Sequence, residues 1–175
     1  NIVTLHKIPT AREERLTFLN LNIFIMHTKQ VIVFRKDLLK GPNAIRKGKF
    51  GAQCAHASLG ALLKFFNIYK QEPVRLGLYE VEPGQIQYKY TVFFEENTVL
   101  DDWLNGKFTK VVVSVDSEEE LLELNKALDD TFIPHALITD SGLTEFHGVP
   151  TNTCLGIGPY VAEEIDKFTG NLPLL

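Results

Sequence analysis

Apolar residues occur along the chain in short runs that predict a series of β-strands. The runs at 29–35 and 110–115 are typical of strands buried on both faces of a sheet. Two further strands are expected at 135–139 and 153–158. Because helical segments separate these runs, the pattern predicts an α/β fold: a single domain with a mixed four-stranded sheet and helices on both faces.

Three helices are expected between and after these strands. The first runs from about Lys47 to Phe66, and the second begins at the capping-box pair Ser117 and Glu120. Pro159 at the start and Gly170 at the end mark the last helix. The first helix is rich in small residues, which indicates close packing against a sheet or against a second subunit. These residues are Gly51, Ala52, Ala55, Ala57, Ser58, Gly60 and Ala61.

The region 67–108 shows a different pattern. Apolar and polar residues alternate from Ile86 to Phe94 after a turn signal at 82–84, which predicts an inserted β-hairpin. A short helical segment containing Trp103 is expected to follow it. The aromatic residues of this insertion would either cover core or stack on nucleic-acid bases, and the pattern leaves both open.

Composition and charge narrow the functional classes. A chain of 175 residues, 45% hydrophobic and 23% charged, can form one domain with a substantial core and needs no membrane span. The net charge of −4 argues against a protein that coats nucleic acid with its whole surface. Basic residues nevertheless gather between Arg35 and Lys49, where the first helix begins. This helix N-terminus is expected to bind phosphate, carboxylate or a developing oxyanion, and a solvated basic loop is the simpler alternative.

Cysteines and histidines offer little chemistry of their own. Cys54 and Cys154 lie in apolar contexts, which suits a reducing cytosol. The five histidines have no metal-ligand spacing, so no metal or other cofactor is expected. Cys54 and His56 cannot form a nucleophile pair, because side chains two residues apart on a helix point in nearly opposite directions.

Three ordered segments resemble the archaeal and eukaryotic type (type 2) of peptidyl-tRNA hydrolase. The first is the lysine-glycine-lysine helix opening at 47–61, KGKFGAQCAHASLGA. The second covers 110–124, KVVVSVDSEEELLEL. The third begins with LITDSGLTE at 137–145 and continues with TCLGIGPYVAEEIDKFTGNLPLL at 153–175. The chain is therefore identified as a divergent member of that family with an insertion.

The resemblance implies hydrolysis of the ester bond of peptidyl-tRNA, which releases tRNA and peptide. It implies a cytoplasmic homodimer with tRNA as its partner, and it supplies the catalytic candidates. Lys49 matches the essential lysine of the family, and Asp140 matches its aspartate, expected to activate or orient water. Thr144 and Thr153 match the hydroxyl residues around the site.

Four further residues are expected to contact substrate. Lys49, Gln53 and His56 fall on one face of the first helix, so Gln53 and His56 are placed along the site, with a packing role as the alternative for His56. Lys47 and Arg46 are expected to touch the tRNA backbone.

Two departures from the family pattern leave other functions open. Leu143 stands where the family commonly has arginine, and Arg46 stands where it has glycine. Arg46 or the inserted hairpin could replace the missing phosphate contact. The alternatives are a non-catalytic RNA- or protein-binding module of the same fold, or a hydrolase of another acylated anionic substrate.

The chain is expected to divide into an N-terminal extension, residues 1–28, and a hydrolase-like α/β domain, residues 29–175. Met26, the only methionine, lies just before the first family-like strand, so residues 1–25 are interpreted as upstream of the natural start or added by cloning. A genuine extension that docks through its apolar residues is the alternative.

Overall fold

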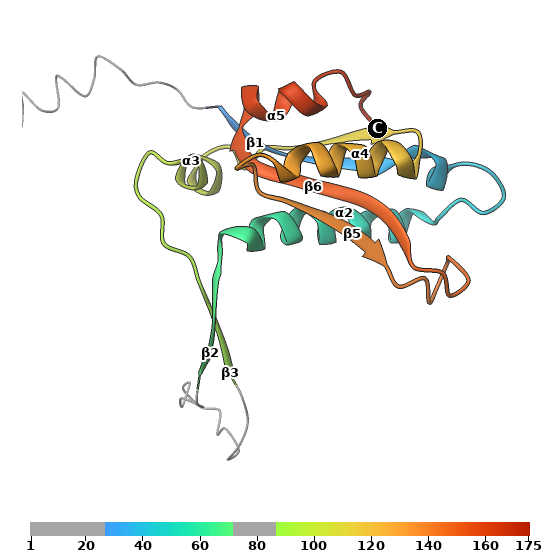
Figure 1. Cartoon of the computed structure of the whole chain (residues 1–175), viewed down its shortest axis with the longest axis horizontal. Coiled ribbons are helices and arrows are strands. Elements are labelled where there is room, and N and C mark those ends of the chain that lie inside the picture. The colour runs from blue at the N-terminus through green and yellow to red at the C-terminus, as the bar shows by residue number, and fades with distance from the viewer. Residues whose placement is uncertain (1–26, 72–86) are drawn as a thin grey trace, which may run out of the picture.

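A computed structural model describes residues 27–71 and 87–175 of the chain (Figure 1). Four strands form one sheet in the order β4-β1-β6-β5, with β4 parallel to β1 and β6 antiparallel to both of its neighbours. The strands are β1 (Thr28–Arg35), β4 (Lys110–Val115), β5 (His135–Asp140) and β6 (Thr151–Val161). The predicted mixed four-stranded sheet is confirmed.

Helices cover both faces of this sheet, as predicted. Figure 1 shows α2 (Lys47–Leu62) on one side, and α4 (Glu118–Asp129) and α5 (Ala162–Thr169) on the other. Neighbouring residues of β1 point to opposite faces, since alternate side chains of a strand do so. Val31 and Val33 pack in the core beneath α4 and α5, and Ile32 and Phe34 pack in the core beneath α2.

The small residues of α2 serve its contact with the sheet. A Cβ atom added at Gly156 of β6 would lie 2.1 Å from the carbonyl oxygen of Ala57, so the helix backbone rests directly on the strand. A Cβ atom at Gly60 would lie 3.2 Å from the side chain of Ala136 in β5. These contacts confirm the expected packing against a sheet and fix α2 across β6 and β5.

Two helix boundaries differ from those predicted. The first helix ends at Leu62 and continues as a 3-10 turn, η3 (Leu63–Phe65). Pro159 does not begin the last helix but lies within β6, and α5 starts at Ala162. The ladder between β1 and β6 shifts register next to Pro159, and such an irregularity admits a residue that has no N–H to donate. Gly170 follows the end of α5, as expected.

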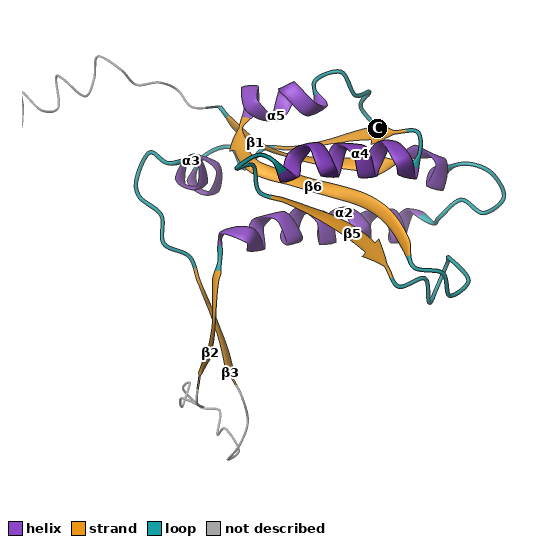
Figure 2. Cartoon of the chain, in the orientation of Figure 1, coloured by secondary structure: helices purple, strands orange, loops and turns teal. Residues whose placement is uncertain are grey.

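The insertion forms a separate two-stranded ribbon that leaves the C-terminal end of α2 (Figure 2). Its strands are β2 (Asn67–Gln71) and β3 (Gln87–Thr91), paired antiparallel with Ile68 opposite Tyr90. The predicted turn at 82–84 falls in residues 72–86, outside the described part of the chain. Tyr88 and Tyr90 are exposed, so in this ribbon they do not cover core.

Two short helices complete the fold. The helix α3 (Val99–Asn105) carries the buried Trp103, as predicted, and η2 (Lys36–Leu39) follows β1. Each helix in the described part of the chain is too short or too polar to cross a membrane.

Candidate active site

The N-terminal end of α2 presents unpaired backbone donors. The N–H of Phe50 bonds to the carbonyl of Arg46 at 3.0 Å and closes the first helical turn. The N–H groups of the residues just before Phe50 therefore have no acceptor within the helix. No acidic residue occupies this first turn, so the helix itself places no negative charge at the positive end of its dipole.

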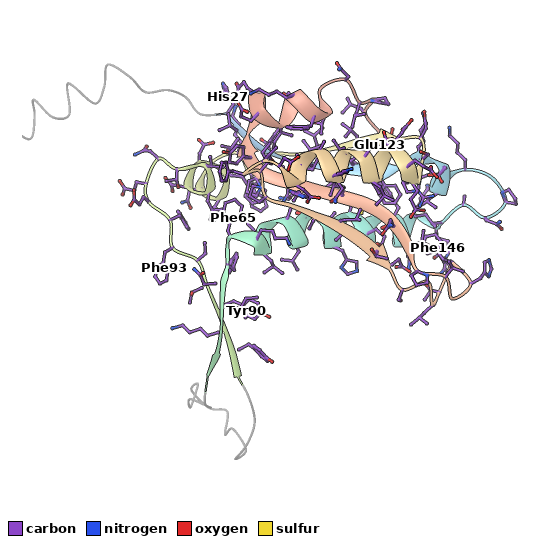
Figure 3. The ribbon with its side chains drawn as sticks, in the orientation of Figure 1. His27, Phe65, Tyr90, Phe93, Glu123 and Phe146 are labelled. Carbon is purple, nitrogen blue, oxygen red and sulfur yellow. The ribbon has the colours of Figure 1, made fainter. Side chains whose placement is uncertain are left out.

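The loop between β5 and β6 folds back over this helix end. Gly142 has φ of +80°, and a Cβ atom there would lie 2.3 Å from the carbonyl oxygen of Val149, so only glycine fits. Two backbone hydrogen bonds close the loop. The N–H of Gly148 donates to the carbonyl of Gly142, and the N–H of Val149 donates to the carbonyl of Phe146, both at 2.9 Å. Figure 3 shows Phe146 in this loop, beside the start of α2. The loop thereby brings its side chains against the lysine motif.

Lys49 and Asp140 form an ion pair at this meeting point. The Lys49 ammonium contacts Asp140 Oδ2, and the two side chains are only 13% and 10% exposed. Lys49 Nζ also donates to Thr144 Oγ1 at 3.1 Å and lies 5.5 Å from the centre of the Phe146 ring. These contacts hold the ammonium at one position, between Asp140, Thr144 and Phe146.

The Asp140 carboxylate is held by three donors. Lys49 and Gln53 Nε2, the latter at 2.7 Å, reach Oδ2, while the N–H of Gly142 reaches Oδ1 at 2.8 Å. Burial alone would raise the pKa of Asp140, but the Lys49 and Gly142 hydrogen bonds, the Lys49 charge and Gln53 together lower it below its usual value. A carboxylate offers roughly four acceptor positions, so about one remains for a water molecule.

Thr153 sets the orientation of Gln53. Both side chains are buried, and Thr153 Oγ1 donates to Gln53 Oε1 at 2.8 Å. Because the amide oxygen accepts from Thr153, the amide NH₂ group faces Asp140. Thr153 therefore acts on the site through Gln53, whereas Thr144 contacts Lys49 directly.

The basic residues near the site divide into two groups. Arg35 pairs with Asp37 and Glu118 at the end of the sheet, so it supports the fold and does not extend the anion surface. Arg46, Lys47 and Lys40 are exposed around the start of α2. Arg46 is held there by Glu145, which accepts from Arg46 Nε at 2.8 Å and from its N–H at 3.0 Å.

A cavity of about 720 Å³ extends from Asp140 along the side of α2. Its walls are residues 137–141 of β5 and the following loop, and one face of α2 and η3. That helical face consists of Gln53, His56, Leu59, Gly60 and Leu63. His56 is exposed and lines this cavity, which contradicts the packing alternative for this residue.

The two cysteines are not candidates for a nucleophile. Burial raises the pKa of Cys54 to about 11 and that of Cys154 to about 12, so both are neutral thiols near pH 7. Within residues 27–71 and 87–175, no three His, Cys, Asp or Glu side chains come together to hold a metal ion.

The family model described as Peptidyl-tRNA hydrolase PTH2 matches residues 28–175. The chain belongs to this family.

Three archaeal peptidyl-tRNA hydrolases illustrate the similarity. That of Methanopyrus kandleri is 39% identical over 147 residues, covering 84% of this chain and 97% of the relative. The Methanothermobacter thermautotrophicus protein is 38% identical, and the match covers 84% of this chain and 99% of the relative. The Thermococcus sibiricus protein is 36% identical, and the match covers 84% of this chain and 97% of the relative. The resemblance stated from three sequence segments is thus confirmed.

The structure of this peptidyl-tRNA hydrolase family member brings together the site candidates from separate segments of the sequence. Lys49, Gln53, Asp140, Thr144 and Thr153 form one connected set of contacts. Lys47 is exposed beside them, and Leu143 is 84% exposed at the loop tip.

Two contributing residues escaped the sequence analysis. Glu145 positions Arg46, and its charge opposite a basic helix start is a signal that could have found it. Phe146 lies beside the Lys49 ammonium, and no sequence pattern indicates it.

Proposed function

We propose that this protein hydrolyses the ester bond that joins a peptide to the terminal ribose of tRNA. Membership of the peptidyl-tRNA hydrolase family supports the substrate. The observation that carries the chemistry is the Lys49 and Asp140 pair, which is held on three sides and lies at the open end of a helix.

In the proposed mechanism, Asp140 orients a water molecule through its remaining acceptor position. The water oxygen attacks the ester carbonyl, and its proton passes through Asp140 to the departing ribose oxygen. Because its pKa is lowered, Asp140 is ionised near pH 7 but is a weak base. The larger part of the rate enhancement is therefore assigned to the stabilisation of the oxyanion by Lys49 and the helix N-terminus.

The exposed basic residues around the start of α2 are proposed to bind the tRNA backbone. Arg46 and Lys47 are at the entrance of the site, and Arg46 supplies a positive charge that the loop lacks at Leu143. Gln53 holds Asp140 and, with His56, contacts the substrate where the cavity begins.

The cytoplasm and a homodimeric state are part of the same proposal. Two free cysteines suit a reducing compartment. The outward side of α2 carries the exposed small residues Gly51, Ala52 and Ala55, which would allow close approach of a second α2. Light scattering coupled to gel filtration gives the mass directly, and a monomer at micromolar concentration would contradict the dimer.

The decisive experiment compares Lys49→Ala with Lys47→Ala. Release of tRNA from a peptidyl-tRNA is followed on an acidic gel. Lys49→Ala is expected to lower kcat by about a thousandfold or more, because an oxyanion donor is lost. Lys47→Ala is expected to raise KM only a few fold, as for a single backbone contact. Full activity in Lys49→Ala would contradict the proposed mechanism, and binding without release by the unmodified protein would indicate a non-catalytic module.

A further inference from the structure

The cavity beside Asp140 is bounded by a strand edge. In the sheet, β5 is the terminal strand, and among the described strands it pairs with β6 alone. Consecutive residues of β5 and its loop, 137–141, line the cavity. Since alternate side chains point to opposite faces, a run of consecutive lining residues indicates that the cavity follows the edge of the strand and not one face.

The backbone of Leu137 faces this free edge. The N–H of Gly158 bonds to the carbonyl of Pro134 at 2.7 Å, which identifies Pro134 and Gly158 as a hydrogen-bonded pair. Pairs alternate along an antiparallel ladder, so Ala136 and Ile138 bond to β6 while Leu137 directs its N–H and C=O away from it. An extended chain lying in the cavity could bond to Leu137 as an added strand does.

The two ends of the cavity differ in polarity. Asp140 and Gln53 lie at one end, and Leu59 and Leu63 lie toward the C-terminal end of α2. No lysine or arginine of the described chain lines the cavity. A polyanion is therefore not its natural occupant, and the exposed basic residues are outside it, around the start of α2.

We infer that the cavity binds the peptide part of peptidyl-tRNA, extended along the free edge of β5. This inference rests on the proposed function and assigns the two halves of the substrate to opposite ends of α2. The ester lies at Asp140, so the peptide C-terminus is there, and its N-terminal part extends toward Leu63. The peptide then runs in the same direction as β5 and pairs with it in parallel.

Backbone pairing suits a substrate that has no fixed sequence. Peptides released from stalled translation differ in every side chain but share their N–H and C=O groups. A strand edge recognises those groups, and the shallow apolar contacts of Leu59 and Leu63 add affinity with little selectivity. The part of β5 that lines the cavity accommodates about four residues at roughly 3.3 Å each.

The first test varies the length of the peptide on one tRNA, from a single acetylated amino acid to a hexapeptide. The expected kcat/KM rises by roughly tenfold up to about four residues and is then constant, since further residues lie beyond the strand edge. Equal values for all lengths would overturn the inference while leaving the proposed function intact. If none of the substrates is hydrolysed, the proposed function itself fails.

The second test uses two matched leucines. Leu63 is 37% exposed in the cavity wall, and Leu122 is 39% exposed on α4, which covers the opposite face of the sheet. Leu63→Gln is expected to lower kcat/KM about fivefold for a tetrapeptidyl-tRNA and to leave the acetylaminoacyl-tRNA unaffected. Leu122→Gln should leave both unchanged. An equal loss on both substrates in Leu63→Gln would contradict peptide binding here.

The third test addresses the backbone bonds from the substrate side and needs no change in the protein. Methylation of a single peptide nitrogen removes one N–H donor. Since every second N–H of a strand points toward its neighbour, methylation should lower kcat/KM by roughly tenfold at alternate positions only. Uniform losses, or none, would exclude strand pairing.

Discussion

The two ends of α2 contrast sharply although one helix joins them. At the N-terminal end, Lys49 and Gln53 are each fixed by contacts to the loop after β5 or to β6. At the C-terminal end, roughly 24 Å away by helix length, Leu63 leads into a ribbon in which Tyr88 and Tyr90 are exposed. Polar side chains acquire a defined geometry where distant segments of the chain meet.

The contrast predicts that the largest losses of activity come from the N-terminal end. Asp140→Asn keeps the shape of the side chain but removes the charge that pairs with Lys49 and orients water. The expected fall in kcat is about a thousandfold, measured as tRNA release under saturating substrate. Thermal unfolding of the same variant serves as a control. The loss of activity can be assigned to the site only if the variant is folded at the assay temperature.

Gln53→Leu is expected to have the next largest effect, a fall in kcat of roughly tenfold to a hundredfold, because Asp140 loses a donor and Thr153 loses its acceptor. Hydrogen bonds to the ionised form lower a pKa, so their loss raises that of Asp140. The acid limb of the kcat/KM profile should therefore move to higher pH in this variant.

In the unmodified protein, the acid limb of the kcat/KM profile should lie at a pH below the usual pKa of a free aspartate, because the pKa of Asp140 is lowered. Its ion pair stabilises the fold above the pKa of the unfolded chain, and this stability is lost as pH falls through the lower folded value. Urea unfolding at several acidic pH values measures the effect. A limb near neutral pH would show that another group limits the rate.

Removal of single surface charges should have a smaller effect and should again distinguish the two ends. Arg46→Ala at the start of α2 is expected to raise KM a few fold. It should also reduce the slope of log KM against log salt concentration by about one, because one phosphate contact is lost. Lys64→Ala in η3 is the matched control at the other end, with neither change expected. Equal salt slopes in the two variants would mean that tRNA contacts both ends.

The smallest effect is expected in the ribbon. Tyr88→Ser with Tyr90→Ser removes two exposed rings that lie far from Asp140, so kcat/KM should change by less than about twofold. Stacking of tRNA bases on these rings would instead weaken binding by roughly tenfold or more per ring. A loss of that size would show that the ribbon, like the N-terminal end of α2, contacts tRNA.

Sequence alone predicted the elements that carry their own signal. The buried strands, the cap at Ser117 and the first helix follow from local periodicity and capping chemistry. Pro159 misled the prediction, because its usual place at a helix start was overridden by an irregular strand pairing with β1. Pairing between strands that are far apart in the sequence cannot be predicted from the residues around Pro159 alone.

The candidate site could likewise be predicted only in part. Lys49 and Asp140 could be named from motifs, but their ion pair depends on how the loop after β5 folds back, which Gly142 and Val149 determine. Thr153 was expected around the site, and the structure shows that its hydroxyl contacts Gln53. Only three-dimensional structure shows such an indirect arrangement.

The Gln53 and Thr153 contact also has a consequence for the synthesis of the protein. The two residues are separated by 100 positions, and the loop with Asp140 lies between them. A growing copy of this chain is itself a peptide esterified to tRNA, which is the proposed substrate. Since the site is complete only after Thr153 has been added and β6 has joined the sheet, an unfinished copy has no means of cutting itself free.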